Sequence, residues 1–314
     1  MNPFLSVILA VHNGENFVAA TLESVRMQHN DEIEVVFVDD ASTDRTLEIA
    51  RNFAESFPMR IITPGRNVGV AAATNIGLRE ARGEWACLLD HDDLWLPGRI
   101  ARLWGEMKST KCALVLHNAM IINPDGQRLG PWTCPLSEGD VPPDQFIERL
   151  LVQNFIAKLS PVFRLRDALD TGGVDESIIV CYDWDFWLRL GSLGPVRFIA
   201  ETLSAYRVHP TSLTVSRKLA PNEWEQQLTI VLDRHLSKWT GTGKRRASVE
   251  RAARASITVN SSLIAATRGE PAKPLAVFLQ LLSLGPAGWR LYLRDSRIVQ
   301  RLSPRLKLLR SKTS

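Results

Sequence analysis

Short apolar runs alternate with helical stripes along the first part of the chain. The runs are rich in branched side chains, as strands buried on both faces of a sheet are, and they predict strands at 5–11, 33–40, 60–63 and 85–90. Between them, apolar residues recur at helical spacing in the stretches 18–25, 47–57 and 70–83. This alternation predicts an α/β fold with a mostly parallel sheet flanked by helices.

The pattern changes twice further along the chain. From residue 113 it predicts strands at 113–122, near 161–163 and as two short strands within 196–210, with helices near 146–152 and 183–191. After about residue 215 it predicts helices at 223–239, 245–268 and 274–284. We therefore expect an α/β domain over residues 1–215 and a helical C-terminal region over residues 216–314.

Composition narrows the class of protein. The chain has 314 residues, 45% of them hydrophobic, which is the composition of a globular protein. Its net charge of +4 is small and gives no reason to expect a nucleic-acid partner. Cysteines 87, 112, 134 and 181 form no Cys-x-x-Cys pair, which favours reduced thiols in a cytoplasmic protein. No apolar run has the length needed to cross a bilayer, so we expect a soluble or membrane-peripheral chain.

Two acidic clusters end predicted strands. Asp39 and Asp40 end the second, and Asp-His-Asp-Asp at 90–93 ends the fourth. Ligands of parallel α/β sheets bind beyond the carboxyl ends of the strands. A divalent cation such as Mg²⁺ or Mn²⁺ would relieve the repulsion within 90–93, whereas a solvated loop that caps the next helix is the alternative. Asp39 or Asp40 would accept a ring N–H of uracil or thymine, or would simply form a turn.

Two later segments carry further candidates. Asp183 lies among aromatic residues in "CYDWDFWLRL", a setting that raises the pKa of a carboxylate toward that of a general base. An ion pair with Arg189 is the alternative. In "YRVHPTS", Arg207 and His209 would meet a pyrophosphate and a metal, or form the polar outside of an edge strand.

Five ordered segments carry a family resemblance. They are "SVILAVHNGENFVAATLESVRMQ", "VFVDDASTDRTLEIA", "RNVGVAAATNIGLREARGEWACLLDHDDLWLP", "GGVDESIIVCYDWDFWLRL" and "AYRVHPTSLT". Together they resemble the family 2 glycosyltransferases of the GT-A fold, over roughly residues 4–215. Dinucleotide (G-x-G-x-x-G) and P-loop signatures are absent from the sequence.

The resemblance implies a role for each matching position. Asp39 would read the base, Asp90 would contact the ribose, and Asp183 would be the catalytic base. The implied metal ligands are Asp92, Asp93 and His209, for Mn²⁺ or Mg²⁺. The rest of the donor side would be formed by Ala10, His12, Asn13, Glu15, Asp40, Asn67, Gly69, Asn75, His91 and Arg207. Tyr182 and Trp184 would lie on the acceptor side.

The implied activity is inverting sugar transfer from a nucleoside diphosphate donor, UDP- or dTDP-linked. The acceptor would be a hydroxyl of a glycan or a lipid-linked molecule, in cell-surface polysaccharide synthesis. Two departures stand out: Ala10 with His12-Asn13 replaces the family's Pro and Tyr-Asn, and Tyr182 replaces a glutamate. Without a Gln-x-x-Arg-Trp segment, a non-processive enzyme is favoured. An inactive sugar-nucleotide-binding scaffold and a nucleotidyltransferase remain alternatives.

The C-terminal tail is basic. Residues 289–314 carry eight Lys/Arg and one acid. On a helix, one face would hold the arginines 290, 294, 297 and 301, and another would hold Leu291, Ile298 and Leu302. Such a tail would contact an anionic membrane surface, at the cytoplasmic face of the inner membrane. The alternatives are a helix that packs on the protein with its basic face in solvent, or a frayed terminus.

Overall fold

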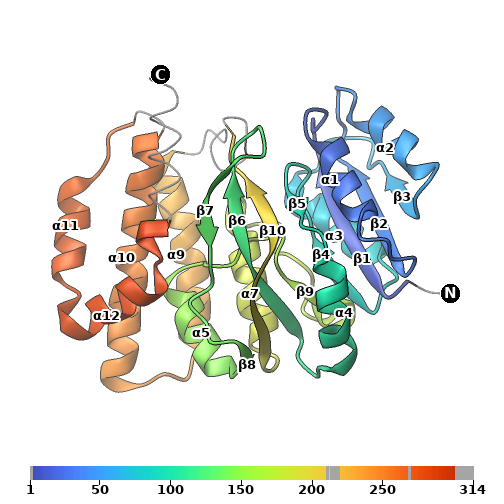
Figure 1. The fold of residues 1–314 in the computed structure, drawn as a ribbon. Coiled ribbons are helices and arrows are strands. Elements are labelled where there is room, and N and C mark those ends of the chain that lie inside the picture. The colour runs from blue at the N-terminus through green and yellow to red at the C-terminus, as the bar shows by residue number, and fades with distance from the viewer. Residues whose placement is uncertain (1–2, 210–211, 213–219, 268–269, 301–314) are drawn as a thin grey trace.

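A computed structural model gives the structure of this chain and describes residues 3–209, 212, 220–267 and 270–300. One sheet of ten strands runs through the molecule and is flanked by helices (Figure 1). Along the sheet the strand order is β3-β2-β1-β4-β9-β6-β10-β5, with β7 paired to β6 and β8 to β10. The predicted α/β class is confirmed.

The first half of the sheet is parallel, as the sequence predicts. It contains β1 (Leu5–Val11), β2 (Ile33–Asp39), β3 (Met59–Ile62) and β4 (Trp85–Leu88). The connecting helices are α1 (Val18–Arg26), α2 (Thr46–Ala54) and α3 (Val70–Glu80). Every residue of β2 is buried, which explains its continuous apolar sequence.

The second half of the sheet is mixed. β9 (Val162–Arg164) lies antiparallel between β4 and β6 (Leu114–Ile122), and β6 pairs in parallel with β10 (Val196–Arg207). The prediction of two short strands within 196–210 is wrong, because β10 is one strand whose register with β6 shifts between residues 199 and 204. The short strands β5 (Leu94–Trp95), β7 (Arg128–Trp132) and β8 (Gly139–Val141) complete the sheet.

Helices close the second half and the C-terminal end. Beside the sheet lie α4 (Arg99–Ser109), α5 (Pro143–Val152), α6 (Leu165–Asp170) and α7 (Tyr182–Gly191). The C-terminal helices are α9 (Pro221–Lys238), α10 (Gly243–Thr267), α11 (Pro274–Leu282) and α12 (Gly285–Asp295). α10 packs on α5, α9, α11 and α12, and one apolar cluster joins the sheet to α9 and α10. The expected domain boundary near residue 215 falls outside the described residues and stays a prediction.

The cysteines and the C-terminal tail were also subjects of prediction. All four cysteines are buried free thiols, as expected. The predicted continuous tail helix is wrong, because α12 ends at Asp295 and Arg297 has a φ of 50°, which a right-handed helix does not accommodate. Residues 301–314, including Arg301 and Leu302, lie outside the described part. Within the part that is described, no helix is both long and apolar enough to cross a membrane.

Candidate active site

The carboxyl ends of β1, β2 and β4 bring the predicted donor residues together. Val11 at the end of β1 is paired with Asp39 at the end of β2, and the Nδ1 atom of His12 lies 2.8 Å from the backbone oxygen of Asp40. On the other side, β4 is paired with β1 up to Leu88, so the segment 90–93 follows at the same edge of the sheet. Parallel pairing therefore places both acidic clusters at one edge.

Asp39 and Asp40 have different surroundings. Both are buried, but the two carboxylate oxygens of Asp40 accept hydrogen bonds from the backbone N–H groups of Val68 (2.6 Å) and Gly69 (2.9 Å). Asp40 thus holds the loop before α3. Asp39 accepts one hydrogen bond at 3.4 Å from Ser42 N, and its Oδ1 has no partner among the described residues. Asp39 is the carboxylate left available to a ligand.

The turn after β1 is tied to the turn after β2. Asn13, with a φ of 55°, donates its backbone N–H to the Ser42 hydroxyl and accepts from Thr43 N. Glu15 accepts from Arg45 N at 3.0 Å. His12 and Asn13 are exposed at the strand end, whereas the predicted donor residue Ala10 lies partly buried within β1.

The predicted donor residues around α3 separate into two groups. Asn67 donates to the backbone oxygen of Asp40 at 3.3 Å, and Gly69, with a φ of 87°, precedes the first residue of α3, so both border the strand ends. Asn75 lies elsewhere. Its amide NH₂ donates to the backbone oxygen of Val174 and to the carboxylate of Glu176, and its amide oxygen accepts from the backbone N–H of Val174. It joins α3 to the loop before α7.

Asp90 is paired with a lysine that the sequence analysis missed. The Lys158 ammonium donates to Asp90 Oδ1 at 2.5 Å and to the Tyr182 hydroxyl at 2.8 Å. Burial alone would lower the pKa of Lys158, but the Asp90 carboxylate and the Tyr182 oxygen raise it above its usual value. Lys158 is therefore a fixed positive charge. The available signal was its isolation in the apolar run 155–159.

Asp92 lies against His209. Its Oδ2 is 2.7 Å from His209 Nε2, and both side chains are largely buried. Burial acts to raise the pKa of Asp92, yet the hydrogen bond from His209 and the nearby imidazoles of His91 and His209 hold it below its usual value. The structure thus joins residues that are 117 positions apart in the chain.

Asp93 and Arg207 lie beneath this pair. Asp93 is fully buried and accepts a hydrogen bond from Arg207 N at 2.9 Å, while its Oδ2 has no partner among the described residues. Burial, and then the charges of Asp92 and Asp90, raise the pKa of Asp93 well above its usual value. The Arg207 guanidinium donates to the backbone oxygens of Asp92, Asn123 and Pro124. Arg207 therefore fixes the loop that holds Asp92.

His91 also supports the loop. Its ring lies so close to Gly14 that a Cβ atom there would approach His91 Cδ2 to 2.7 Å. The Thr21 hydroxyl of α1 lies 2.7 Å from the backbone oxygen of His91 and 2.8 Å from that of Asp93. Helix α1 and the first turn thereby hold the segment 90–93 in place.

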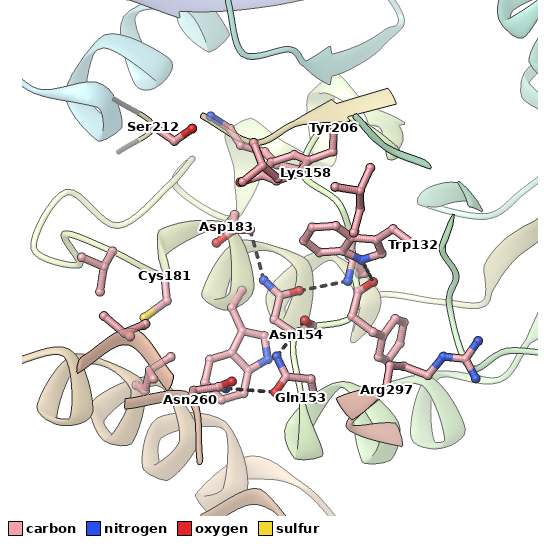
Figure 2. Close-up of a pocket in the computed structure, with 18 of the residues that line it drawn as sticks. Trp132, Gln153, Asn154, Lys158, Cys181, Asp183, Tyr206, Ser212, Asn260 and Arg297 are labelled. Carbon is pink, nitrogen blue, oxygen red and sulfur yellow. Dashed lines mark hydrogen bonds between the residues drawn. The ribbon is translucent and has the colours of Figure 1, made fainter. Parts of the chain in front are cut away.

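Asp183, in the first turn of α7, faces a cavity of about 370 Å³. Its Oδ2 accepts a hydrogen bond from Asn154 at 3.1 Å (Figure 2). Burial raises the pKa of Asp183, and the positive charge of Lys158 is the largest opposing influence. A carboxylate whose pKa is raised above its usual value is better suited to accept a proton.

The cavity connects the strand ends with the C-terminal helices. Lys158 borders it on one side, and Asn260 of α10 and Arg297 after α12 lie on the other (Figure 2). Asp90, the partner of Lys158, also lines the cavity. Aromatic side chains supply much of its wall: Trp132, Phe155, Tyr182, Trp184, Tyr206 and Trp224. Trp184 is anchored by a 2.8 Å hydrogen bond to the backbone oxygen of Leu150. An apolar wall with a few polar groups is typical of a small-molecule site.

Asp92 and His209 are the residues suited to hold a metal. Carboxylate oxygen and imidazole nitrogen are both ligands of Mn²⁺, and Asp92 Oδ2 lies 2.7 Å from His209 Nε2. In the described residues, no group of three or more His, Cys, Asp or Glu side chains forms a complete ligand set. The residues fit a metal that takes its remaining ligands from phosphate and water, as Mg²⁺ commonly does.

Comparisons with known proteins agree with this arrangement. The family model described as glycosyl transferase family 2 matches residues 6–158. An uncharacterized protein of Mycobacterium tuberculosis is 28% identical over 218 residues, which is 65% of this chain and 59% of that protein. An uncharacterized glycosyltransferase of Haemophilus influenzae is 27% identical over 216 residues, 68% of this chain and 71% of its own length. The match thus spans only about three fifths of the mycobacterial relative.

Solved structures share the fold. Staphylococcus aureus TarS 1–349 in complex with UDP-GlcNAc superimposes with a TM-score of 0.66 at 15% identity, covering 96% of this chain and 91% of that chain. The mannosyltransferase PcManGT of Pyrobaculum calidifontis, in complex with GDP-Man and Mn²⁺, gives 0.55 at 18% identity, covering 98% and 88%. Residues 6–158 of this chain therefore match glycosyl transferase family 2, and the chain has the GT-A fold that it shares with these structures.

Proposed function

We propose that this chain is a metal-dependent, inverting glycosyltransferase that uses a UDP- or dTDP-linked sugar donor. The acceptor is a hydroxyl of a glycan or of a lipid-linked molecule, in the synthesis of a cell-surface polysaccharide. One observation carries the proposal: Asp90 borders the same cavity as the partly buried carboxylate of Asp183, with the Asp92–His209 pair two residues further along the same loop.

The donor would bind along the edge formed by β1, β2 and β4. The free Oδ1 of buried Asp39 supports a contact with a ring N–H, because an unpaired buried carboxylate oxygen is costly unless a ligand pairs with it. Uracil and thymine both present such an N–H. The UDP-GlcNAc complex of TarS supports a uridine donor, whereas PcManGT is in complex with GDP-Man.

Asp92 and His209 would hold the metal, and Asp90, fixed by Lys158, would contact the ribose. Bound Mn²⁺ or Mg²⁺ would offset the negative charge of the departing diphosphate. The Mn²⁺ complex of PcManGT supports this choice of ion. Asp93, which is fully buried and bonded to Arg207 N, supports the loop in this account and is not needed as a ligand.

Asp183 would take the proton from the acceptor hydroxyl as that oxygen attacks the anomeric carbon. Attack from the face opposite to the diphosphate breaks the bond to the leaving group in one displacement and inverts the configuration. Asn154 orients the carboxylate, and the positive charge of Lys158 opposes the rise in the pKa of Asp183 that burial causes. Tyr182 stands where the family usually has glutamate, so no negative charge is present at this position. Its hydroxyl accepts a hydrogen bond from the Lys158 ammonium.

The acceptor would enter from the side of the C-terminal helices. Trp184 and Tyr182 line the cavity next to Asp183, and their rings offer flat apolar surfaces of the kind that ligands pack against. Polar groups lie further along the wall, where Gln153 accepts hydrogen bonds from Ser256 and Asn260. A mixed wall suits a sugar, which has both apolar faces and hydroxyl edges.

A ligand screen by thermal unfolding tests the proposal. UDP or dTDP with Mn²⁺ is expected to raise the unfolding midpoint by about 5 °C, and either alone by less. Wild type and Asp183→Asn should respond alike, because Asp183 serves the acceptor. Asp170→Asn, an exposed aspartate of α6, is the control. A shift with nucleoside triphosphate only would favour a nucleotidyltransferase.

Turnover separates an enzyme from an inactive scaffold. Donor hydrolysis or transfer should release nucleoside diphosphate with wild type and fall sharply with Asp183→Asn. If both proteins bind the diphosphate and neither releases any from a panel of donor sugars, the chain is a binding protein and the catalytic assignment is wrong.

A further inference from the structure

Helix α11 (Pro274–Leu282) has no polar side. Its sequence, PLAVFLQLL, contains one polar residue and no charge, and none of its residues is buried. Leu275, Phe278, Leu279 and Leu282 are exposed by 69%, 58%, 55% and 61%. Their spacing of three and four places them on one side of the helix. We call these four residues the apolar face of α11.

The opposite side of α11 is the one that the protein covers. Val277 and Leu281, four positions apart, pack against the main core together with buried Leu284. α11 lies at the outer edge of the molecule, beyond α10 (Figure 1). A helix that is apolar all round is normally buried all round. Here one side has a partner within the described chain and the apolar face does not.

Helix α12 presents a similar outer side. Trp289 and Leu293, one turn apart, are exposed, and Arg290 between them is exposed as well. The apolar residues that the sequence analysis assigned to a membrane contact, Leu291 and Ile298, instead pack on the core. This contact agrees with the alternative that the tail packs on the protein, and not with a membrane contact through these two residues. α11 and the outer side of α12 carry the exposed ones.

Charge is distributed unevenly along the chain. Residues 271–314 contain nine Lys/Arg and one Asp, a net charge of +8, so residues 1–270 carry −4 of the total of +4. A basic segment that follows exposed apolar helices matches the two attractions of an anionic bilayer, to acyl chains and to headgroups.

We propose that the apolar face of α11, with Trp289 and Leu293 of α12, docks on an anionic lipid surface. The helices would lie in the interface, and the basic residues would meet the headgroups. A second copy of the chain is the poorer occupant, because a two-fold contact through this face would bring together two copies of residues 271–300, each with a net charge of +3 from four Lys/Arg and one Asp.

Docking would place the cavity close to the lipid. α10 packs against α11 and also lines the cavity through Asn260 and Ile264, so the two surfaces share one rigid helix. A lipid-linked acceptor would then reach Asp183 while still anchored. This purpose rests on the proposed function, but lipid binding itself does not.

Vesicle co-sedimentation of the full chain tests the proposal. Vesicles of equimolar phosphatidylglycerol and phosphatidylcholine are expected to bind wild type, and vesicles of phosphatidylcholine alone to bind it at least about tenfold more weakly. The double variant Leu275→Gln/Leu279→Gln should lose at least about tenfold in binding to the anionic vesicles. Leu193→Gln is the matched control, since this leucine is 52% exposed after α7.

Several results would overturn the proposal. These are no binding of wild type, unchanged binding of the double variant, or an equal loss with Leu193→Gln. Gel filtration that shows a wild-type dimer and a monomeric double variant would assign the face to a second copy. UDP binding is measured on the same samples with Mn²⁺, and its retention by all variants shows that they are folded and keeps a failure of docking distinct from a failure of the proposed function.

Discussion

Replacing Asp185 by asparagine is expected to destabilise the fold by about 3 kcal/mol. Asp185 is fully buried in α7, two residues after the proposed base. Its Oδ1 accepts hydrogen bonds from His235 Nε2 (2.8 Å) and Arg234 Nη1 (3.0 Å) of α9, and its Oδ2 accepts one from Arg189 Nε (2.8 Å). This carboxylate therefore joins α7 to the C-terminal helices.

The magnitude follows from these contacts. A hydrogen bond to a charged group contributes about 1.5–3 kcal/mol, and breaking a buried ion pair costs about 3–5 kcal/mol. The asparagine side chain keeps one oxygen that can accept from His235 or Arg234. Its NH₂ group replaces the oxygen that accepts from Arg189, and because both groups are donors this hydrogen bond is lost. We take the lower end of the range, because the guanidinium groups of Arg189 and Arg234 keep some contact with water.

The effect should depend on pH. Burial opposes ionisation, but the hydrogen bond from His235 and the charges of Arg189 and His235 hold the pKa of Asp185 far below its usual value. A pKa lower in the folded than in the unfolded state stabilises the fold above the unfolded pKa of about 3.9, and this stabilisation disappears as the pH falls. The difference between wild type and variant should therefore be full at pH 7 and shrink below about pH 4.

Urea unfolding followed by tryptophan fluorescence measures this difference. Asp170→Asn of α6 is the matched control, because Asp170 and Arg166 form the same i,i+4 pair at 3.5 Å but are 69% and 91% exposed. That variant should lose less than about 0.5 kcal/mol. Equal losses for the two variants, or a difference that does not change with pH, would refute the reasoning.

Three further predictions concern the site. Asp183→Asn should lower kcat by about 10²–10⁴ with UDP affinity unchanged, and steady-state kinetics with wild-type rates would contradict its role. Lys158→Met removes the positive charge that opposes the effect of burial on the pKa of Asp183, so the acidic limb of the kcat/KM profile should move to higher pH; a limb that stays in place or moves to lower pH would contradict this role. Asp40→Ala leaves the backbone N–H groups of Val68 and Gly69 unpaired and should lower the unfolding midpoint by about 5 °C in calorimetry. An unchanged midpoint would show that these two hydrogen bonds do not stabilise the fold.

The parallel half of the sheet could be predicted from sequence because β1, β2 and β4 are buried on both faces. Strand β1 has the bounds 5–11 that its apolar run gives, and β2 ends at Asp39. The short strands β5, β7 and β8 could not be found in this way. β5 has two residues, and β7 contains a proline and exposed positions, so neither shows a periodic pattern.

The site was predictable in its residue types but not in its pairings. Strand ends located the carboxylates, yet nothing local distinguishes Asp92, which meets His209, from Asp93, which turns into the core toward Arg207 N. The roles of such neighbours depend on β10, more than a hundred residues away. Lys158 was missed for the same reason, since its partners Asp90 and Tyr182 come from distant elements.

The metal response of UDP binding tests the central claim most directly. Isothermal titration calorimetry would measure the UDP Kd with and without Mn²⁺ for wild type and for Asp92→Asn. The account predicts that Mn²⁺ tightens UDP binding to wild type by about tenfold or more, and that the substitution abolishes this gain while metal-free binding is kept. An equal gain from Mn²⁺ in both proteins would contradict it.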